Sequence, residues 1–215
     1  PDSVVNAAGA WAEEVAAMAA LDVSMAPARG VMVSVDFDGV EPVLNRCRDP
    51  DDGDIVVPHE REAVLGTTSV PVSDPDEYER ADWEIERSIE ECAAMVPAVA
   101  DAAVERTWWG VRPLYEPDES GGDRRGISRG FFLLDHADDG VDNVASIVGG
   151  KLTTYRQMAA ATADLVCERL GVEADCETGE RRLLGADDPG RLDEFVARYD
   201  GQGPTDADVV GSGNS

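Results

Sequence analysis

The chain has 215 residues, a length that suits one large domain or two small ones with a sizeable buried core. It carries 45 aspartates and glutamates against 18 lysines and arginines, a formal net charge of -27, which argues against binding to nucleic acid or directly to an anionic membrane surface. Hydrophobic residues make up 43% of the sequence, which excludes intrinsic disorder because disorder requires low hydrophobicity as well as high charge.

The first part of the chain predicts a strand, a tight turn and a helix. Val4 and Val5 predict a short buried strand, the small residues 6–9 a turn, and residues 10–20 a helix rich in alanine and glutamate. Alternating valines in 31–36 then predict a strand with one apolar face.

The middle of the chain predicts more strands and one helix. We expect two antiparallel strands at 54–60 and 63–70, followed by a helix at 82–97 whose apolar residues recur at spacings of three and four. Further strands are expected at 104–115 and 130–136.

The last part of the chain predicts a strand that leads into a long helix. Residues 144–150 form an apolar strand, and a helix with one buried face is expected from Lys151 to Leu170, ended by Gly171. Another helix is expected at 190–199.

Cysteines and histidines offer no metal site. The four cysteines form no C-x-x-C pair and only two histidines are present, so we expect no zinc and reduced thiols in a cytoplasm. No apolar run approaches the roughly 20 residues that span a bilayer. The acidic composition with almost no lysine resembles proteins of salt-accumulating microbes; the alternative is an acidic mesophilic protein.

Lys151 is the only lysine of the chain and follows two glycines, Gly149 and Gly150. A buried strand that enters a helix through glycines directs backbone N–H groups and the positive end of the helix dipole at one spot, which favours an anion. We expect the glycines to let a ligand approach the backbone. A compact ammonium cannot be replaced by the broad fork of arginine, so we interpret Lys151 as functional. The alternative is a packing turn with a solvated lysine.

Arg112 is the second candidate, in the segment GVRPL. An arginine between a strand and a proline presents its guanidinium rigidly, which suits bidentate binding of phosphate or carboxylate. An internal ion pair with an aspartate is the alternative. The turn at 6–9 also allows close approach to the backbone, although such turns usually serve packing.

Together the motifs resemble one enzyme family. VVNAAGAW, PARG, NRCR, IVVP, GTTS, GVRPL, SRG, LLDHA and GGKLTTYRQMA follow the order found in flavin-dependent glycerol-3-phosphate dehydrogenases, and NRCR with LLDHA is most similar to the large catalytic subunit of the anaerobic enzyme. The resemblance covers about residues 1–185. It implies an α+β fold with a mostly antiparallel substrate-binding sheet covered by helices, plus C-terminal pieces of a Rossmann-type FAD domain. The FAD pieces would be 1–22 and 140–172, the substrate-binding domain 23–139, and a C-terminal extension or linker 173–215.

The resemblance also implies residue roles. Arg112 would bind the substrate phosphate, and Lys151 would lie near the reacting hydroxyl and the flavin as a catalytic and substrate-binding residue. Arg46 would add a phosphate contact, with a surface arginine as the alternative, and His136 would position a loop. FAD contacts are implied for Ala8, Gly9, Gly149, Gly150, Leu152 and Thr153.

The implied reaction is oxidation of sn-glycerol 3-phosphate to dihydroxyacetone phosphate with FAD, electrons passing to a quinone through membrane-anchoring or electron-transfer subunits. The protein would be cytoplasmic, or held at the cytoplasmic face of the membrane by those subunits. The chain has no GxGxxG fingerprint, so we expect a piece of a longer protein that binds FAD poorly alone. The alternatives are an oxygen-using glycerophosphate oxidase, a related amine-oxidising flavoprotein, or an inactive truncated module.

Overall fold

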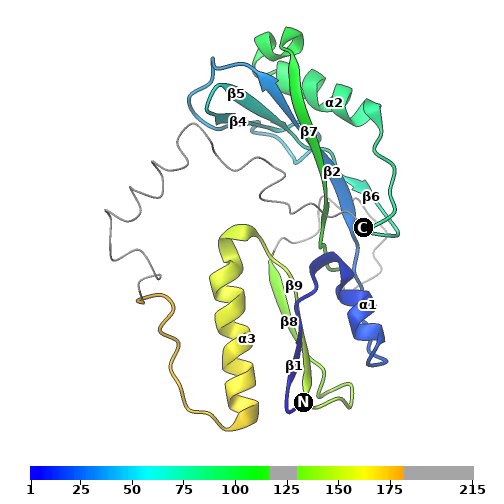
Figure 1. Cartoon of the computed structure of the whole chain (residues 1–215), viewed down its shortest axis with the longest axis vertical. Coiled ribbons are helices and arrows are strands. Elements are labelled where there is room, and N and C mark those ends of the chain that lie inside the picture. Colours follow the sequence, from blue (N-terminus) through cyan, green and yellow to red (C-terminus); the bar gives the residue numbers. More distant parts are fainter. Residues whose placement is uncertain (117–129, 182–215) are drawn as a thin grey trace, which may run out of the picture. The chain divides into compact units, whose positions relative to one another are not determined.

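The computed structural model describes residues 1–116 and 130–181 of the chain (Figure 1). Its internal contacts divide the chain into two units, Pro1–Val172 and Glu173–Ser215. The strands and helices described below all lie in the first unit. The helix expected at 190–199 lies outside the described residues.

The larger sheet has six strands among the described residues, and every pairing in it is antiparallel. Its order is β3-β4-β5-β2-β6, and β7 also pairs with β2. The mostly antiparallel sheet expected from the sequence is therefore confirmed. The strand bounds are β2 Ala28–Asp36, β3 Leu44–Asn45, β4 Ile55–His59, β5 Glu62–Gly66, β6 Val70–Pro71 and β7 Val104–Arg112.

The central strand β2 supplies the core of this sheet. Val31, Val33 and Val35 are fully buried, which confirms the predicted apolar face, and α2 (Asp82–Ala93) packs over them (Figure 1). Helix α2 ends at Ala93, before the expected end at residue 97. Its successor η2 (Pro97–Asp101) is a short 3-10 helix that begins with proline, since a first helical residue needs no N–H partner.

The smaller sheet has the order β1-β9-β8. Strand β1 (Val4–Asn6) pairs with β9 (Val144–Gly149) in parallel, and β8 (Phe131–Asp135) pairs with β9 antiparallel. Strand β8 lies within the expected substrate-binding part, but it pairs with β9 of the smaller sheet. The apolar pattern of a strand does not say which sheet it joins.

Two short helical segments follow β1, η1 (Gly9–Trp11) and α1 (Ala12–Ala17), so the predicted helix is shorter than expected. The expected burial of Val4 and Val5 is wrong: they are 38% and 39% exposed. An edge strand has a neighbour on one side only, which leaves its side chains partly open.

The last described helix, α3 (Tyr155–Leu170), follows η4 (Leu152–Thr154). Gly171 ends it in the left-handed conformation, φ 64°, as predicted. The expected buried face is only partly present: within α3 Thr162 is buried and Met158 and Val166 are half-buried, but Ala159 and Ala163 are exposed. Leu152 of η4 is 88% exposed. Apolar periodicity identifies a face that needs a neighbour but not the segment that supplies it. None of the described helices is long and apolar enough to cross a bilayer.

The buried thiol of Cys92 makes stability depend on alkaline pH. Burial raises its pKa from the ordinary 9.0 to about 11, and the thiol lies 3.3 Å from the carbonyl oxygen of Gly53. The thiolate therefore forms more easily in the unfolded chain, so stability present below pH 9 is lost as pH rises towards 11.

We expect the free energy of unfolding to fall by about 2 kcal/mol between about pH 8 and 10.5 because of this group. Urea denaturation at both pH values measures the fall, which should be smaller in Cys92→Ala. The matched control is Cys47→Ala, since Cys47 is exposed. Equal pH dependence in Cys92→Ala and the parent chain would contradict the prediction.

Candidate functional site

A cavity of about 480 Å³ brings together the charged residues singled out in the sequence. Four cationic side chains line it, against the two carboxylates of Asp51 and Asp54. The hydroxyl-bearing residues Thr67, Thr68 and Ser69 also line it. In a chain of net charge -27, this cavity concentrates positive charge and hydroxyl groups at one place, which suits an anion.

The structure places Arg46, Arg112 and Lys151 around this one cavity although they are far apart in sequence. The fourth cation, Arg48, was missed as a site residue, although it belongs to the NRCR motif. The residues with implied FAD contacts do not line this cavity: Ala8, Gly9, Gly149, Gly150, Leu152 and Thr153.

Arg112 lies at the end of β7, opposite Ala28 of β2. One terminal nitrogen, Nη2, donates to the hydroxyl of Thr67 and to the carbonyl of Thr68, both at 3.0 Å. The other, Nη1, donates to the carbonyl of Arg29 at 3.4 Å. These three contacts are to neutral oxygens, and they orient the guanidinium.

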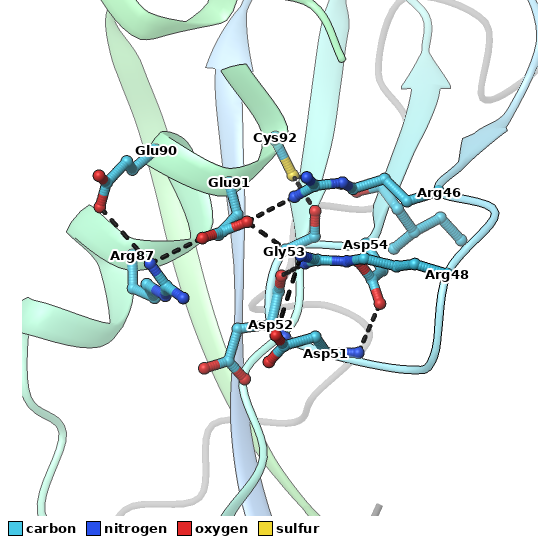
Figure 2. A network of polar contacts seen from close by, with 11 residues as sticks. Arg46, Arg48, Asp51, Asp52, Gly53, Asp54, Arg87, Glu90, Glu91 and Cys92 are labelled. Atoms are coloured by element: carbon cyan, nitrogen blue, oxygen red, sulfur yellow. Dashed lines mark hydrogen bonds and ion pairs between the residues drawn. The ribbon is translucent and has the colours of Figure 1, made fainter. Parts of the chain in front are cut away.

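Arg46 and Arg48 are held by Glu91 of α2 (Figure 2). Arg87, on the same helix, donates to the second oxygen of that carboxylate at 2.7 Å. The Nε of Arg48 donates to Asp54 at 2.8 Å, and this hydrogen bond raises the pKa of Arg48. Three guanidinium groups therefore share one carboxylate, and the two that line the cavity are fixed from the side of α2.

Lys151 presents its side chain at the start of η4. Its side chain is exposed and makes no ion pair with any residue in 1–116 or 130–181. Its backbone N–H donates to the hydroxyl of Thr154 at 2.9 Å, and that hydroxyl donates to the Lys151 carbonyl. The N–H of Gly150 donates to Gly130. The sequence predicts backbone N–H groups that point at an anion. For Gly150 and Lys151 this prediction is wrong, because acceptors within the protein already bind their N–H groups.

The two glycines before Lys151 are required by the turn itself. Gly149 and Gly150 have φ of 74° and 78°, in the left-handed region that favours glycine. A Cβ at Gly149 would lie 2.7 Å from the carbonyl of Gly130, and one at Gly150 would lie 2.4 Å from the sulfur of Met158. Backbone conformation and packing are sufficient reasons for these glycines, and the ligand approach suggested by the sequence stays a prediction.

A buried hydrogen-bond chain holds the turn after β1. The amide of Asn6 donates to the carbonyl of Ala12 at 2.8 Å and to the hydroxyl of Ser146 at 3.3 Å, while its oxygen accepts the N–H of Ala8. The Ser146 hydroxyl lies 2.9 Å from Nε2 of His136, whose Nδ1 lies 2.8 Å from Asp139. His136 thus fixes the loop between β8 and β9 and, through Ser146, the turn.

Comparison with known proteins agrees with this architecture. The sequence profile of the FAD dependent oxidoreductase family matches residues 1–169. The chain belongs to this family. Iminodiacetate oxidase from Chelativorans shares the family's fold with this chain, at a TM-score of 0.58 and 19% identity over 82% of this chain and 44% of that one.

Members that act on glycerol 3-phosphate are more similar in sequence. A subunit of the anaerobic glycerol-3-phosphate dehydrogenase of Haloferax volcanii is 50% identical over 87% of this chain and 32% of that protein, and a subunit of the anaerobic enzyme of Escherichia coli is 38% identical over 88% and 35%. The FAD complex of glycerol-3-phosphate dehydrogenase from Bacillus halodurans aligns at a TM-score of 0.65, with 27% identity over 92% of this chain and 38% of that one. The chain thus spans about a third of the curated relatives' length.

Arg46 and Arg87 form a matched pair for testing the cavity. Both donate to Glu91, but only Arg46 lines the cavity. We expect Arg46→Gln to weaken binding of inorganic phosphate to the full-length protein roughly tenfold, as for loss of one charge-assisted hydrogen bond, and Arg87→Gln to leave it within about twofold. Isothermal titration calorimetry measures both. Equal weakening by the two variants would contradict a role for Arg46 in the cavity.

Proposed function

We propose that the cavity binds the phosphate group of sn-glycerol 3-phosphate, and that the full-length protein oxidises this substrate to dihydroxyacetone phosphate with FAD. The observation that carries the proposal is the set of four cationic side chains around one cavity, against two carboxylates. A phosphate monoester carries a charge between about -1.5 and -2 at pH 7 and three acceptor oxygens, so it matches this excess better than a singly charged carboxylate does. The names of the similar dehydrogenases support the same substrate.

Two places outside the lining of the cavity fit FAD. Gly9 has a left-handed φ of 61°, and a Cβ there would meet no atom within 4 Å, so the backbone at Ala8 and Gly9 is open to a ligand. Leu152 and Thr153 open the helical segment next to Lys151, where helix N–H groups lack intrahelical partners and the dipole favours negative charge. We assign FAD contacts to these four residues, with Gly149 and Gly150 forming the turn that leads to them.

Bound FAD would supply the acceptor for the hydride that leaves C2 of the substrate. Arg112, together with Arg46 and Arg48, would anchor the phosphate, so that the carbon chain is oriented by its charged end. The Lys151 ammonium would donate a hydrogen bond to the oxygen on C2 and stabilise negative charge that develops there.

The electron path beyond FAD is also a proposal. The similar anaerobic dehydrogenases are named as single subunits of their enzymes, which supports partner subunits for this protein. We propose that these partners receive the electrons, pass them to a quinone and hold the protein at the cytoplasmic face of the membrane. Comparing turnover with a quinone analogue and with dissolved oxygen separates this function from that of a glycerophosphate oxidase. We also propose 1–22 and 131–172 as FAD-domain pieces, with the substrate-binding sheet between them.

Replacing Lys151 tests its role in the chemical step. We expect Lys151→Ala to lower kcat for sn-glycerol 3-phosphate by roughly 10²-fold, as for loss of one donor to a developing charge, with FAD content unchanged. Lys151→Arg should not restore kcat, because the planar fork cannot take the position of an ammonium. Steady-state kinetics and flavin absorbance measure both. Arg156→Ala is the control, since Arg156 is on α3 and does not line the cavity. Unchanged kcat in Lys151→Ala would refute the role.

Replacing Arg112 tests recognition of the phosphate. We expect Arg112→Ala to raise KM for sn-glycerol 3-phosphate by roughly 100-fold, since a charge-assisted contact with the phosphate is lost. Turnover of glycerol, which has no phosphate, should not change. A parallel loss with both substrates would assign Arg112 to the fold, and it would favour a different substrate class for the cavity.

A further inference from the structure

A buried polar cluster lies next to Arg112. Glu84 of α2 is fully buried, and Nε and Nη2 of Arg29 contact its Oε1 at 2.9 and 2.8 Å. The hydroxyl of Thr68 donates to its Oε2 at 2.6 Å and accepts the backbone N–H of Val31 at 3.2 Å. Both oxygens of the carboxylate therefore have partners, and its charge is balanced by Arg29.

Such a cluster is a poor source of stability. Removing two charges from water costs several kcal/mol per ion, and apolar residues of the same volume often stabilise a core equally well or better. A buried ion pair does, however, define positions sharply, because each partner must keep its hydrogen-bond geometry. The presence of the cluster of Arg29, Thr68 and Glu84 is therefore better explained by a positioning role than by stability.

What it positions is the guanidinium of Arg112. The carbonyl oxygens of Thr68 and Arg29 accept Nη2 and Nη1 of Arg112. The side chains of these same two residues are bound to Glu84. The buried carboxylate thus holds, from inside the fold, two residues whose backbone oxygens orient a cation that lines the cavity.

Gly30 gives independent evidence that this space is reserved for Arg112. A Cβ at Gly30 would lie 2.7 Å from Nη2 of Arg112, 2.4 Å from the carbonyl oxygen of Thr68 and 2.8 Å from the hydroxyl of Thr67. A methyl group there would have to displace the guanidinium or the two oxygens that hold it. Glycine at this position is therefore required by the packing of Arg112, without any need for a left-handed backbone.

We propose that Glu84 is a positioning residue for substrate recognition, acting through Thr68 and Arg29 to fix Arg112 before the phosphate arrives. This inference rests on the proposed phosphate-binding role of Arg112. A guanidinium that is already oriented loses less conformational freedom on binding, so the cluster lowers KM without taking part in the chemical step.

The link between Thr68 and Glu84 can be cut in the full-length, FAD-loaded enzyme. Thr68→Val removes the hydroxyl and keeps the shape; we expect KM for sn-glycerol 3-phosphate to rise roughly tenfold, with kcat within about twofold and the flavin absorbance unchanged. Thr68→Ser keeps the hydroxyl and should recover the KM of the parent enzyme. Gly30→Ala, which leaves the side chains of Glu84 and Thr68 unchanged but crowds Arg112 directly, should raise KM in the same way. It tests whether KM depends on the position of Arg112 if Thr68→Val fails to fold.

A double-mutant cycle with Arg112→Ala separates this inference from the proposed function. If Thr68 acts through Arg112, the KM of the double variant equals that of Arg112→Ala alone. Multiplicative effects, or a parent-like KM in both Thr68→Val and Gly30→Ala, would overturn the positioning role while Arg112 remained a phosphate ligand. If Arg112→Ala alone leaves KM unchanged, the proposed function fails as well.

Discussion

The antiparallel register between β2 and β7 is the constraint on which the candidate site depends. It sets Ala28 opposite Arg112 and Gly30 opposite Gly110. Because side chains alternate between the two faces of a sheet, a slip of one residue would turn Arg112 away from the oxygens of Thr67 and Thr68. A slip of β2 would instead exchange its buried valines for their neighbours beneath α2. Core packing and site geometry are therefore enforced by the same pairing.

The net charge of the chain explains why the cationic side chains of the cavity must be held close together. A net charge of -27 repels an anionic substrate at long range, so attraction must come from a small region that salt does not fully screen. Glu91 holds Arg46 and Arg48 in that region but offsets part of their charge. The contacts of Arg112 with Thr67, Thr68 and Arg29 are to neutral backbone and hydroxyl oxygens, which orient the guanidinium without adding negative charge.

Local pattern predicted much of the fold and part of the site. Valine alternation identified β2, and apolar spacing with a terminal glycine identified α3 and its end. Lys151 and Arg112 were found because a unique lysine and a guanidinium before proline are unusual in the sequence itself. Both residues line one cavity, but this depends on tertiary structure, which a local sequence pattern cannot predict.

The sequence could not predict the features that depend on contacts between residues distant along the chain. The contact of Glu84 with Arg29 joins residues 55 positions apart, and nothing local to either residue indicates it. The incomplete burial of the apolar face of α3 and the membership of β8 in the smaller sheet are further cases, since periodicity predicts a face or a strand but not its neighbour. The sequence marked the glycines at 149 and 150 as important, but it could not show that Gly130 and Met158 pack against them.

Lys151 follows a strand of the smaller sheet, whereas the three arginines of the cavity come from the larger sheet and the residues next to β3. These like charges repel one another across the boundary between the sheets. A dianion bound among them would attract the cations of both sheets and so hold the two sheets together. Ligand occupancy and cohesion between the two sheets are therefore thermodynamically linked: whatever strengthens one must strengthen the other.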